Sequence, residues 1–320
     1  MSSPKLPNDQ PVDLLPPDIT PYAEGNCGLP YTWRFEAETP GPDVLVTAVV
    51  HGNEPCGAVA LDWLLSSDVR PIKGALTLAF MNYEACLAFD PDEPTTTRWV
   101  DEDFNRVWAG EVLASDRDSV EMRRAREMQP VVARADYLLD IHSMTAPSPP
   151  MMMAGWQTKG RELAHLVGVP ELVVMDRGHA AGRRMRDHGR FAEAGVPGAA
   201  LLVECGQHWD LAAGDLAIEA TLRFLTGLGA IAPDWLEGLG APDPAPQSTW
   251  EVTDPVTIQS ETFTFVRPFQ GGEVLAEAGT LIGHDGPDAV RTPYDDCMLV
   301  MPSPRLKQGL TAVRLARRLG

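Results

Sequence analysis

The stretch Val44-Leu-Val-Thr-Ala-Val-Val-His-Gly-Asn-Glu54 decides how the rest of the chain is interpreted. Residues 44–50 are almost entirely apolar and rich in β-branched side chains, which is typical of a strand covered on both faces in a parallel α/β sheet. A short polar run begins at His51. Because open α/β sheets bind ligands just beyond the carboxyl ends of their strands, this stretch predicts both the fold class and the position of a site.

Length and charge limit the classes of function. The 320 residues suffice for one large domain, or for one domain with a small companion, and a hydrophobic content of 44% supports a substantial core. The formal net charge of -19 disfavours nucleic acids and anionic membranes as partners, because their phosphates would be repelled. An anionic substrate would therefore need local arginines to hold it.

The cysteines and the N-terminus predict the compartment. The chain has 5 scattered cysteines and no Cys-x-x-Cys pair, which argues against a disulfide framework and against a thiolate zinc site. The first residues lack the apolar core of a signal peptide, and no apolar run has the length of a membrane span. We expect a cytoplasmic protein with reduced thiols.

We expect three parts along the chain. Residues 1–25 are rich in proline and aspartate and are expected to form an extended arm over the surface. Residues 26–240 alternate apolar strands with helical segments, which predicts an α/β fold with a doubly wound, mostly parallel sheet and helices on both faces. A proline-rich linker, 241–247, leads into short strands and glycine-rich turns, so a small C-terminal β domain is expected over residues 248–320.

Periodicity places the individual elements of the α/β part. Besides the edge strand, 31–37, we expect strands at 75–81, 137–142, 172–175 and 199–204, and helices at 57–66, 120–135, 159–167, 183–194 and 216–228. Pro130 is expected to kink or end the helix in which it lies.

Three of these strands end in candidate functional side chains: His51 with Glu54, His142, and Glu204. Two imidazoles and a carboxylate form the protein ligand set of a catalytic zinc, with a fourth position left open. Zinc lowers the pKa of a bound water to ~7, and a further carboxylate is then needed to accept the proton. Glu204 is the natural candidate for that base. The ordinary alternatives are a structural core histidine at His142 and an ion pair at Glu204.

Four motifs occur in a fixed order and point to a family. They are His51-Gly-Asn-Glu54, Asp103-Phe-Asn-Arg106, Asp140-Ile-His142 and Val203-Glu-Cys-Gly206. Together they resemble the aspartoacylase/succinylglutamate desuccinylase family of zinc carboxypeptidase-like amidohydrolases. The resemblance covers roughly residues 40–320, including the C-terminal β domain, and implies a hydrolase with one zinc ion per chain. Residues 26–240 are therefore expected to be the zinc hydrolase domain. The implied substrate is a small-molecule N-acyl amino acid, whose amide bond would be cleaved by a metal-activated water.

The resemblance also assigns roles by position. His51, Glu54 and His142 match the zinc ligands, and Glu204 matches the general base.

The resemblance further implies that Asn105 and Arg106 clamp the substrate carboxylate, a task that suits a planar guanidinium and an amide donor. Arg98 matches an arginine that polarises the scissile carbonyl. Without the motif, a surface ion pair with a neighbouring acid would be the preferred interpretation of either arginine. Asp140 lies two residues before His142 and faces the same way along the strand, so we expect it to accept a hydrogen bond from a ligand imidazole.

The sequence departs from the family where substrate is bound. Aspartoacylases carry another substrate-binding arginine shortly before the catalytic glutamate, where this chain has residues 191–198. The arginines a little upstream could replace it: Arg183, Arg184, Arg186 and Arg190. A tyrosine from the C-terminal domain enters some sites of the family, and Tyr294 is the candidate here. Hydrolysis is therefore better supported than any particular acyl amino acid.

The resulting prediction is a zinc-dependent N-acyl amino acid deacylase. One alternative is a carboxypeptidase-like peptidase with the same zinc set, which an open groove would favour over a closed cleft. The other is a catalytically inactive homologue that binds a metal or a ligand. A homo-oligomer is compatible with the sequence, and so is another divalent ion at the site.

Overall fold

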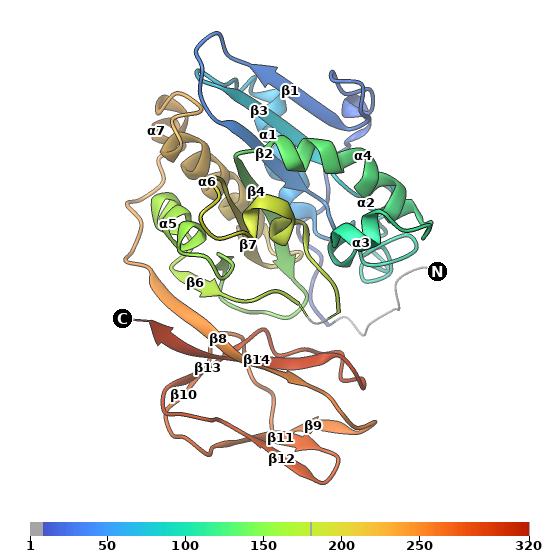
Figure 1. The fold of residues 1–320 in the computed structure, drawn as a ribbon, viewed down its shortest axis with the longest axis vertical. Coiled ribbons are helices and arrows are strands. Elements are labelled where there is room, and N and C mark those ends of the chain that lie inside the picture. Colours follow the sequence, from blue (N-terminus) through green and yellow to red (C-terminus); the bar gives the residue numbers. More distant parts are fainter. Residues whose placement is uncertain (1–8, 180, 320) are drawn as a thin grey trace.

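The computed structural model describes residues 9–179 and 181–319, and one large sheet runs through it (Figure 1). The strands of this sheet span Thr32–Glu36 (β1), Asp43–Ala48 (β2), Ala75–Phe80 (β3), Tyr137–Met144 (β4), Met151–Met153 (β5), Leu172–Met175 (β6), Ala199–Gln207 (β7), Ser248–Thr257 (β8), Val274–Leu275 (β10), Cys297–Val300 (β13) and Thr311–Leu319 (β14). Their order across the sheet is β1-β3-β2-β4-β7-β5-β6-β8-β14-β13-β10.

The centre of the sheet is parallel, as the apolar strands predict. β2 pairs in parallel with β3 and with β4, and β4 pairs in parallel with β7. β1 closes one edge in the antiparallel direction, as expected for the alternating segment 31–37. Because parallel strands end at the same edge, the polar residues that follow β2, β4 and β7 are brought together.

Helices cover both faces of the sheet and create two cores (Figure 1). The helices span Pro55–Ser66 (α1), Tyr83–Leu87 (α2), Gly110–Leu113 (α3), Val120–Arg134 (α4), Thr158–Val167 (α5), Leu211–Gly227 (α6) and Asp234–Leu239 (α7). Buried side chains of α1, α5 and α6 pack on one face, whereas those of α4 pack on the other. This confirms the predicted doubly wound α/β fold. No helix in the described part of the chain is long and apolar enough to cross a membrane.

The C-terminal strands extend the same sheet across the expected linker. β6 pairs in parallel with β8, with Leu172 opposite Ser248. β14 pairs with β8, and three further strands form a second, antiparallel sheet: Phe263–Phe265 (β9), Leu281–Asp285 (β11) and Asp288–Arg291 (β12). In Figure 1 these strands, from orange to red, lie together at one end of the molecule. We call residues 248–319 the C-terminal β unit.

The expected N-terminal arm is only partly described, because its residues 1–8 lie outside the described part. The remainder runs against the α/β part, where Leu14 and Ile19 are buried. The backbone N–H of Leu14 donates to the carbonyl of Trp209 at 2.8 Å. This stretch is therefore packed against the α/β core.

One predicted helix is wrong. Residues 183–194 form two short 3-10 turns, Met185–Asp187 and Gly189–Phe191, instead of a basic helix. Gly189 has a φ of 54°, a left-handed conformation that interrupts a helix. Arg184 and Arg186 instead turn inward to the buried carboxylate of Asp176.

Of the two alternatives for Pro130, the end of the helix is excluded, because α4 continues past it to Arg134. The other predicted strands and helices of the α/β part are present, with ends that differ by a few residues.

Candidate active site

The chain turns sharply where β2 ends, and this turn presents His51 and Glu54. Val49 has a φ of 50°, which a β-branched residue rarely adopts. The backbone of Gly52 packs so closely on Ala85 that an added Cβ would lie 2.3 Å from a backbone carbon. Glu54 N–H then donates to the carbonyl of His51 at 3.2 Å. The glycine is thus required by the close approach of two backbones.

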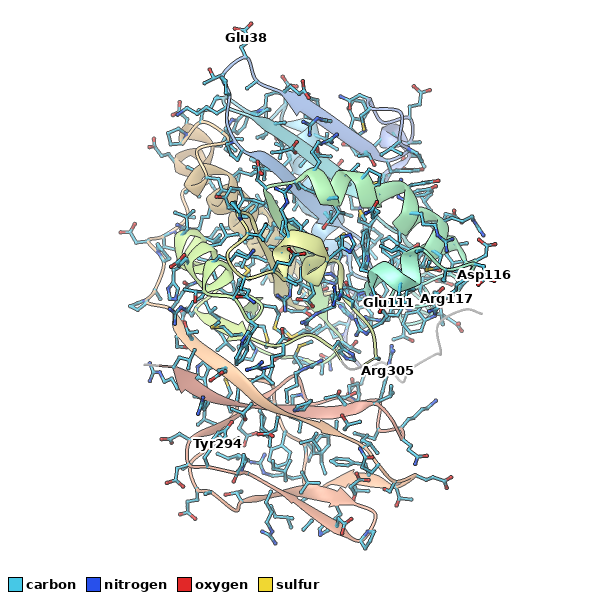
Figure 2. The ribbon with its side chains drawn as sticks, in the orientation of Figure 1. Glu38, Glu111, Asp116, Arg117, Tyr294 and Arg305 are labelled. Atoms are coloured by element: carbon cyan, nitrogen blue, oxygen red, sulfur yellow. The ribbon has the colours of Figure 1, made fainter. Side chains whose placement is uncertain are left out.

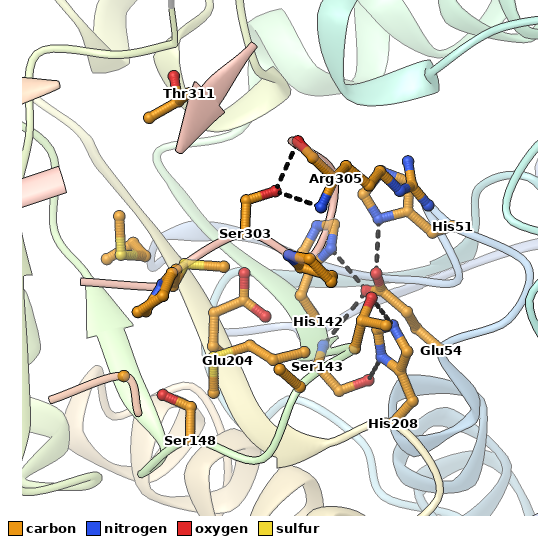
Figure 3. A pocket seen from close by; sticks show the side chains of 18 of the residues that line it. His51, Glu54, His142, Ser143, Ser148, Glu204, His208, Ser303, Arg305 and Thr311 are labelled. Carbon is orange, nitrogen blue, oxygen red and sulfur yellow. Dashed lines mark hydrogen bonds and ion pairs between the residues drawn. The ribbon is translucent and has the colours of Figure 1, made fainter. Parts of the chain in front are cut away.

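The carboxylate of Glu54 lies between two imidazoles (Figure 3). Its Oε1 is 2.7 Å from Nδ1 of His51, and its Oε2 is 2.8 Å from Nδ1 of His142. Each of the three residues offers a ligand atom, and these atoms lie within 4.8 Å of one another. All three side chains are buried. The structure therefore brings the three predicted ligands together.

A carboxylate also faces the other nitrogen of each histidine. Oδ2 of Asp140 is 2.8 Å from Nε2 of His142, and Thr47 donates to the other oxygen of Asp140 at 2.8 Å. Oδ1 of Asp103 is 3.1 Å from Nε2 of His51. Such contacts orient an imidazole and leave Nδ1 directed at the centre of the site. Asp140 lies where the strand alternation predicted it.

Arg98 reaches the same centre. Its guanidinium donates to Oε1 of Glu54 at 3.1 Å and lies 2.9 Å from Nε2 of His51. It also lies 3.7 Å from Asp103. Burial alone would raise the pKa of Asp103, but the charges of Arg106, His51 and Arg98 hold it well below its usual range. The ion pair that was the ordinary alternative for Arg98 is thus present, inside the site.

Asn105 and Arg106 line the same cavity. The amide of Asn105 is 3.4 Å from Nε2 of His142, and its oxygen accepts the backbone N–H of Met185 at 2.9 Å. Arg106 donates to the carbonyl of Asn105 at 2.7 Å and lies 3.9 Å from Asp103. Burial lowers the pKa of the Arg106 guanidinium.

Glu204 lies on the strand next to His142, because the two residues are register partners in the β4–β7 pair. Its side chain is 8% exposed, and its Oε2 has no hydrogen-bond partner among the described residues. Burial raises the pKa of this carboxyl group to about 8. A buried carboxylate oxygen without a partner, facing a cavity, is available for a proton or a water molecule.

His208 is a residue of the site that was not predicted from the sequence. His208 is fully buried, lines the cavity and lies 2.8 Å from the hydroxyl of Ser143 through its Nδ1. Its Nε2 lies 3.1 Å from the hydroxyl of Thr145. Burial lowers the pKa of His208 to about 3, so its ring is neutral. The sequence could have suggested His208 as a site residue, because it lies four residues after Glu204.

The C-terminal β unit forms one wall of the cavity, which has a volume of ≈ 230 Å³. Residues of this wall come from loops and from β14: Phe269, Gly271, Met301, Pro302, Ser303, Pro304, Arg305, Thr311 and Arg314. Figure 2 shows Arg305 at the boundary between the α/β part and the β unit. The cavity is therefore a cleft between the α/β part and the C-terminal β unit.

Tyr294 does not contribute to this wall. Its hydroxyl is 2.6 Å from that of Thr253, and its ring packs against the core of the β unit, away from the cleft (Figure 2). The expectation for Tyr294 is thus contradicted, because the sequence does not show toward which side of the sheet the loop before β13 folds.

The four arginines that were expected to replace the family's substrate-binding arginine lie in different places. Arg184 lines the cavity but is held in an ion pair with Asp176 at 2.7 Å. Arg183 and Arg186 line a neighbouring cavity instead. Arg190 pairs with Asp136 at 3.1 Å, near the opposite ends of the strands.

Glu121, in the first turn of α4, anchors the loop that carries Arg98 and Asn105. Its carboxylate accepts the backbone N–H groups of Val100, Asp101 and Glu102 at 2.7–3.2 Å. The side chain is fully buried and also accepts from Asn82. A single carboxylate thus fixes the part of this loop between Arg98 and Asn105.

Replacing Glu121 with alanine is expected to lower the free energy of unfolding by ~2–4 kcal/mol, because the buried amide of Asn82 and three partly buried backbone donors lose their partner. The matched control is Glu127→Ala on the same helix, where the side chain is 48% exposed and pairs with Arg124 at 3.4 Å. That change should cost less than about 1 kcal/mol. Chemical denaturation measures both, and equal losses would contradict the anchoring role.

The fold and the site together define an α/β protein with a candidate metal centre, placed at the carboxyl edge of a doubly wound sheet. The family model for the succinylglutamate desuccinylase/aspartoacylase catalytic domain matches residues 40–225, more than half of the chain. The chain therefore belongs to the succinylglutamate desuccinylase/aspartoacylase family, which the four motifs predicted. Membership supports an amidohydrolase of the N-acyl amino acid deacylase type.

Individual relatives agree with this assignment. A succinylglutamate desuccinylase from Burkholderia lata is 25% identical over 293 residues, which cover 86% of this chain and 79% of that protein. A succinylglutamate desuccinylase structure from Vibrio parahaemolyticus has a TM-score of 0.69 and 16% identity, with 91% of this chain and 87% of that chain covered. An aspartoacylase family structure from Mesorhizobium loti has a TM-score of 0.62 and 16% identity, with 93% of each chain covered. At these identities the structures show the shared fold.

Proposed function

We propose that the protein is a zinc-dependent hydrolase that cleaves the amide bond of N-acyl amino acids. One observation carries the proposal: the ligand atoms of His51, Glu54 and His142 converge within 4.8 Å in the cavity that Glu204 also lines. Two imidazoles and a carboxylate, with room for a further ligand, are the set that catalytic zinc sites use.

The orientation of the two imidazoles also fits a zinc site. Both imidazoles direct Nδ1 toward Glu54, while a carboxylate faces Nε2 of each. Histidines that bind metals are oriented in this way by an acceptor on the far nitrogen. When bound, zinc supplies Lewis acidity, which lowers the pKa of a water molecule to ~7 and polarises a carbonyl group.

Glu204 is the proposed general base. Its free Oε2 accepts the proton of the attacking water, and the same atom then delivers that proton to the leaving amine. Burial alone favours the protonated form of this carboxyl group. A cation held by the neighbouring His142 favours the ionised form, which the first proton transfer requires.

Arg98 and the pair Asn105–Arg106 are proposed to bind the substrate. The guanidinium of Arg98 stabilises the negative charge that develops on the carbonyl oxygen of the scissile amide. Arg106 and Asn105 hold the carboxylate of the amino acid, because a guanidinium donates two parallel hydrogen bonds to a carboxylate. Asp140 orients His142 and does not contact substrate.

Arg106→Ala tests the clamp. We expect kcat/KM for a carboxylate substrate to fall by about 10–100-fold, because a hydrogen bond to a charged group contributes ~1.5–3 kcal/mol. The loss for the corresponding C-terminal amide should be much smaller, since it offers no charge to bind. Steady-state kinetics with both substrates decides the matter, and an equal loss on the two would make Arg106 a structural residue.

The size of the cavity favours a small substrate over a peptide. The cavity is ≈ 230 Å³ and has walls from both parts of the chain, a size that suits a small ligand. The direct experiment is a hydrolysis screen of N-acetyl, N-succinyl and N-formyl amino acids with the zinc-loaded protein, with peptides as the comparison set. Release of free amine only from peptides would support the carboxypeptidase-like alternative.

A further inference from the structure

A second cavity lies beside the catalytic one, and Arg106 and His179 line both. Its volume of ≈ 620 Å³ falls within the range of small-molecule sites. The described residues that line it all fall within 106–200, so none of them comes from the C-terminal β unit. The second cavity is therefore a feature of the α/β part, and the proposed hydrolysis assigns no task to it.

The lining of the second cavity is basic, although the chain as a whole is acidic. Six of its lining side chains are Lys or Arg and three are Asp or Glu, whereas the whole chain has 26 basic and 45 acidic residues. The basic ones are Arg106, Arg117, Lys159, Arg177, Arg183 and Arg186. Because a hollow lined by one sign of charge concentrates ions of the opposite sign, this cavity attracts anions.

Two of these arginines have no acidic partner. Arg177 stacks over the ring of Trp156, with its guanidinium carbon 3.4 Å from the ring centroid. Neither Arg177 nor Arg183 forms an ion pair with any residue in the ranges 9–179 and 181–319. Arg117 differs from them, because it pairs with Glu102. Two guanidinium groups at the second cavity are thus available to a ligand.

Arg186 supplies a buried guanidinium to the same lining. Its side chain is 2% exposed and pairs with Asp176 and Asp187. Its Nε, however, is buried and has no hydrogen-bond partner among the described residues. A buried donor without a partner is costly, and an oxygen atom of a bound ligand or water would satisfy it. Guanidinium groups bind carboxylate and phosphate oxygens particularly well.

The segment 182–186 joins the second cavity to the proposed carboxylate clamp. The backbone N–H of Met185 donates to the side-chain oxygen of Asn105 at 2.9 Å. Gly182 lies so close to Arg106 that an added Cβ would collide with the backbone carbonyl of Arg106. The chain that carries two arginines of the second cavity is therefore packed directly on both residues of the clamp.

We propose that the second cavity binds a small anion with at least two negative charges, and that this anion is an effector. A phosphate and a polycarboxylate present the same kind of oxygen acceptors to the arginines. The charge of the anion lies beside Arg106, so that this guanidinium attracts the substrate carboxylate less strongly. The anion therefore weakens substrate binding, and the substrate weakens anion binding by the same factor. Anion binding itself is independent of the proposed deacylase function; only the effect on the substrate rests on it.

Calorimetry of the zinc-loaded protein tests the site with two probes, inorganic phosphate and tricarballylate, which distinguish the two sources of charge. Potassium chloride keeps the ionic strength constant, so that screening is the same in every titration. We expect a Kd below about 1 mM for at least one probe. The double variant Arg177→Gln/Arg183→Gln should raise that Kd about tenfold, because two guanidinium groups lose their contact with the anion.

Arg317→Gln is the matched control. Arg317 is an exposed arginine of the C-terminal β unit that pairs with Glu251 at 2.8 Å. Its replacement should leave the Kd of the anion within about twofold of the wild-type value. Thermal unfolding of the double variant shows whether the fold is kept, which we expect because both replaced side chains are exposed.

Steady-state kinetics test the effector role. A saturating concentration of the anion should raise KM for an N-acyl amino acid about fivefold or more and leave kcat unchanged. The double variant should keep the wild-type KM without the anion and lose most of the response to it. A wild-type response in the double variant would contradict the effector role, and so would an unchanged KM in a wild-type protein that binds the anion.

The site itself would be overturned by the absence of binding heat with both probes. An equal Kd in the wild type and the double variant would also overturn it, because the anion would then bind at the metal or in the catalytic cavity. If the wild-type protein hydrolyses no N-acyl amino acid, the deacylase proposal fails. The calorimetric comparison of the wild type with the double variant still decides whether the second cavity binds anions.

Discussion

Glu204→Gln is expected to lower the turnover of N-acyl amino acids by ~10²–10⁴-fold, which is the share that a positioned general base commonly contributes. Glutamine keeps the shape and the hydrogen-bonding capacity of the side chain but accepts no proton at neutral pH. The zinc content and the affinity for substrate should remain close to those of the wild type. Metal analysis, calorimetry and steady-state kinetics on the same preparation test all three statements.

Glu54→Gln provides the matched comparison, because Glu54 is the other buried glutamate of the site. Its carboxylate lies between His51 and His142, at 2.7 and 2.8 Å from their Nδ1 atoms. We expect this variant to lose zinc readily, since a neutral amide is a poorer ligand than a carboxylate. A zinc-free Glu204→Gln protein beside a fully loaded Glu54→Gln protein would reverse the two assignments.

The second large effect concerns the imidazoles. His51→Ala and His142→Ala should each lose zinc and activity together, because two remaining ligands hold a catalytic ion poorly. Activity is expected to fall below the detection limit of the assay at stoichiometric zinc. His165→Ala is the control, as His165 lies on α5 and contacts Thr249 at 3.2 Å, on a different surface.

Zinc is measured by mass spectrometry after gel filtration of the loaded variants. Stoichiometric zinc in the His51→Ala or the His142→Ala protein would remove that residue from the ligand set. Loss of zinc from His165→Ala would show that the assay reports general damage.

The sequence predicted the centre of the site because its determinants are local. Residues 44–50 form a strand by composition, and the parallel pairing of β2, β4 and β7 brings the ends of the strands to one edge. His51, His142 and Glu204 follow from that geometry alone. Asp140 follows from the alternation of side chains along a strand.

What the sequence did not predict depends on packing between distant segments. The guanidinium of Arg314 reaches the cleft only because β8 joins the edge of the central sheet and carries β14 with it. Glu121 is recognisable as an anchor only when the loop folds back over α4.

The helix expected over residues 183–194 failed for a similar reason. A buried carboxylate, Asp176, draws Arg184 and Arg186 inward, and this tertiary contact outweighs the helical propensity of a basic segment.

The central claim is that one zinc ion held by His51, Glu54 and His142 makes the chain an N-acyl amino acid deacylase. The most direct test is a titration of metal-free protein with zinc, during which hydrolysis of the N-acyl amino acid set is followed. The account predicts that activity rises linearly and reaches a plateau at about one equivalent of zinc per chain. Full activity before zinc is added, or no hydrolysis of any N-acyl amino acid at the plateau of zinc binding, would contradict it.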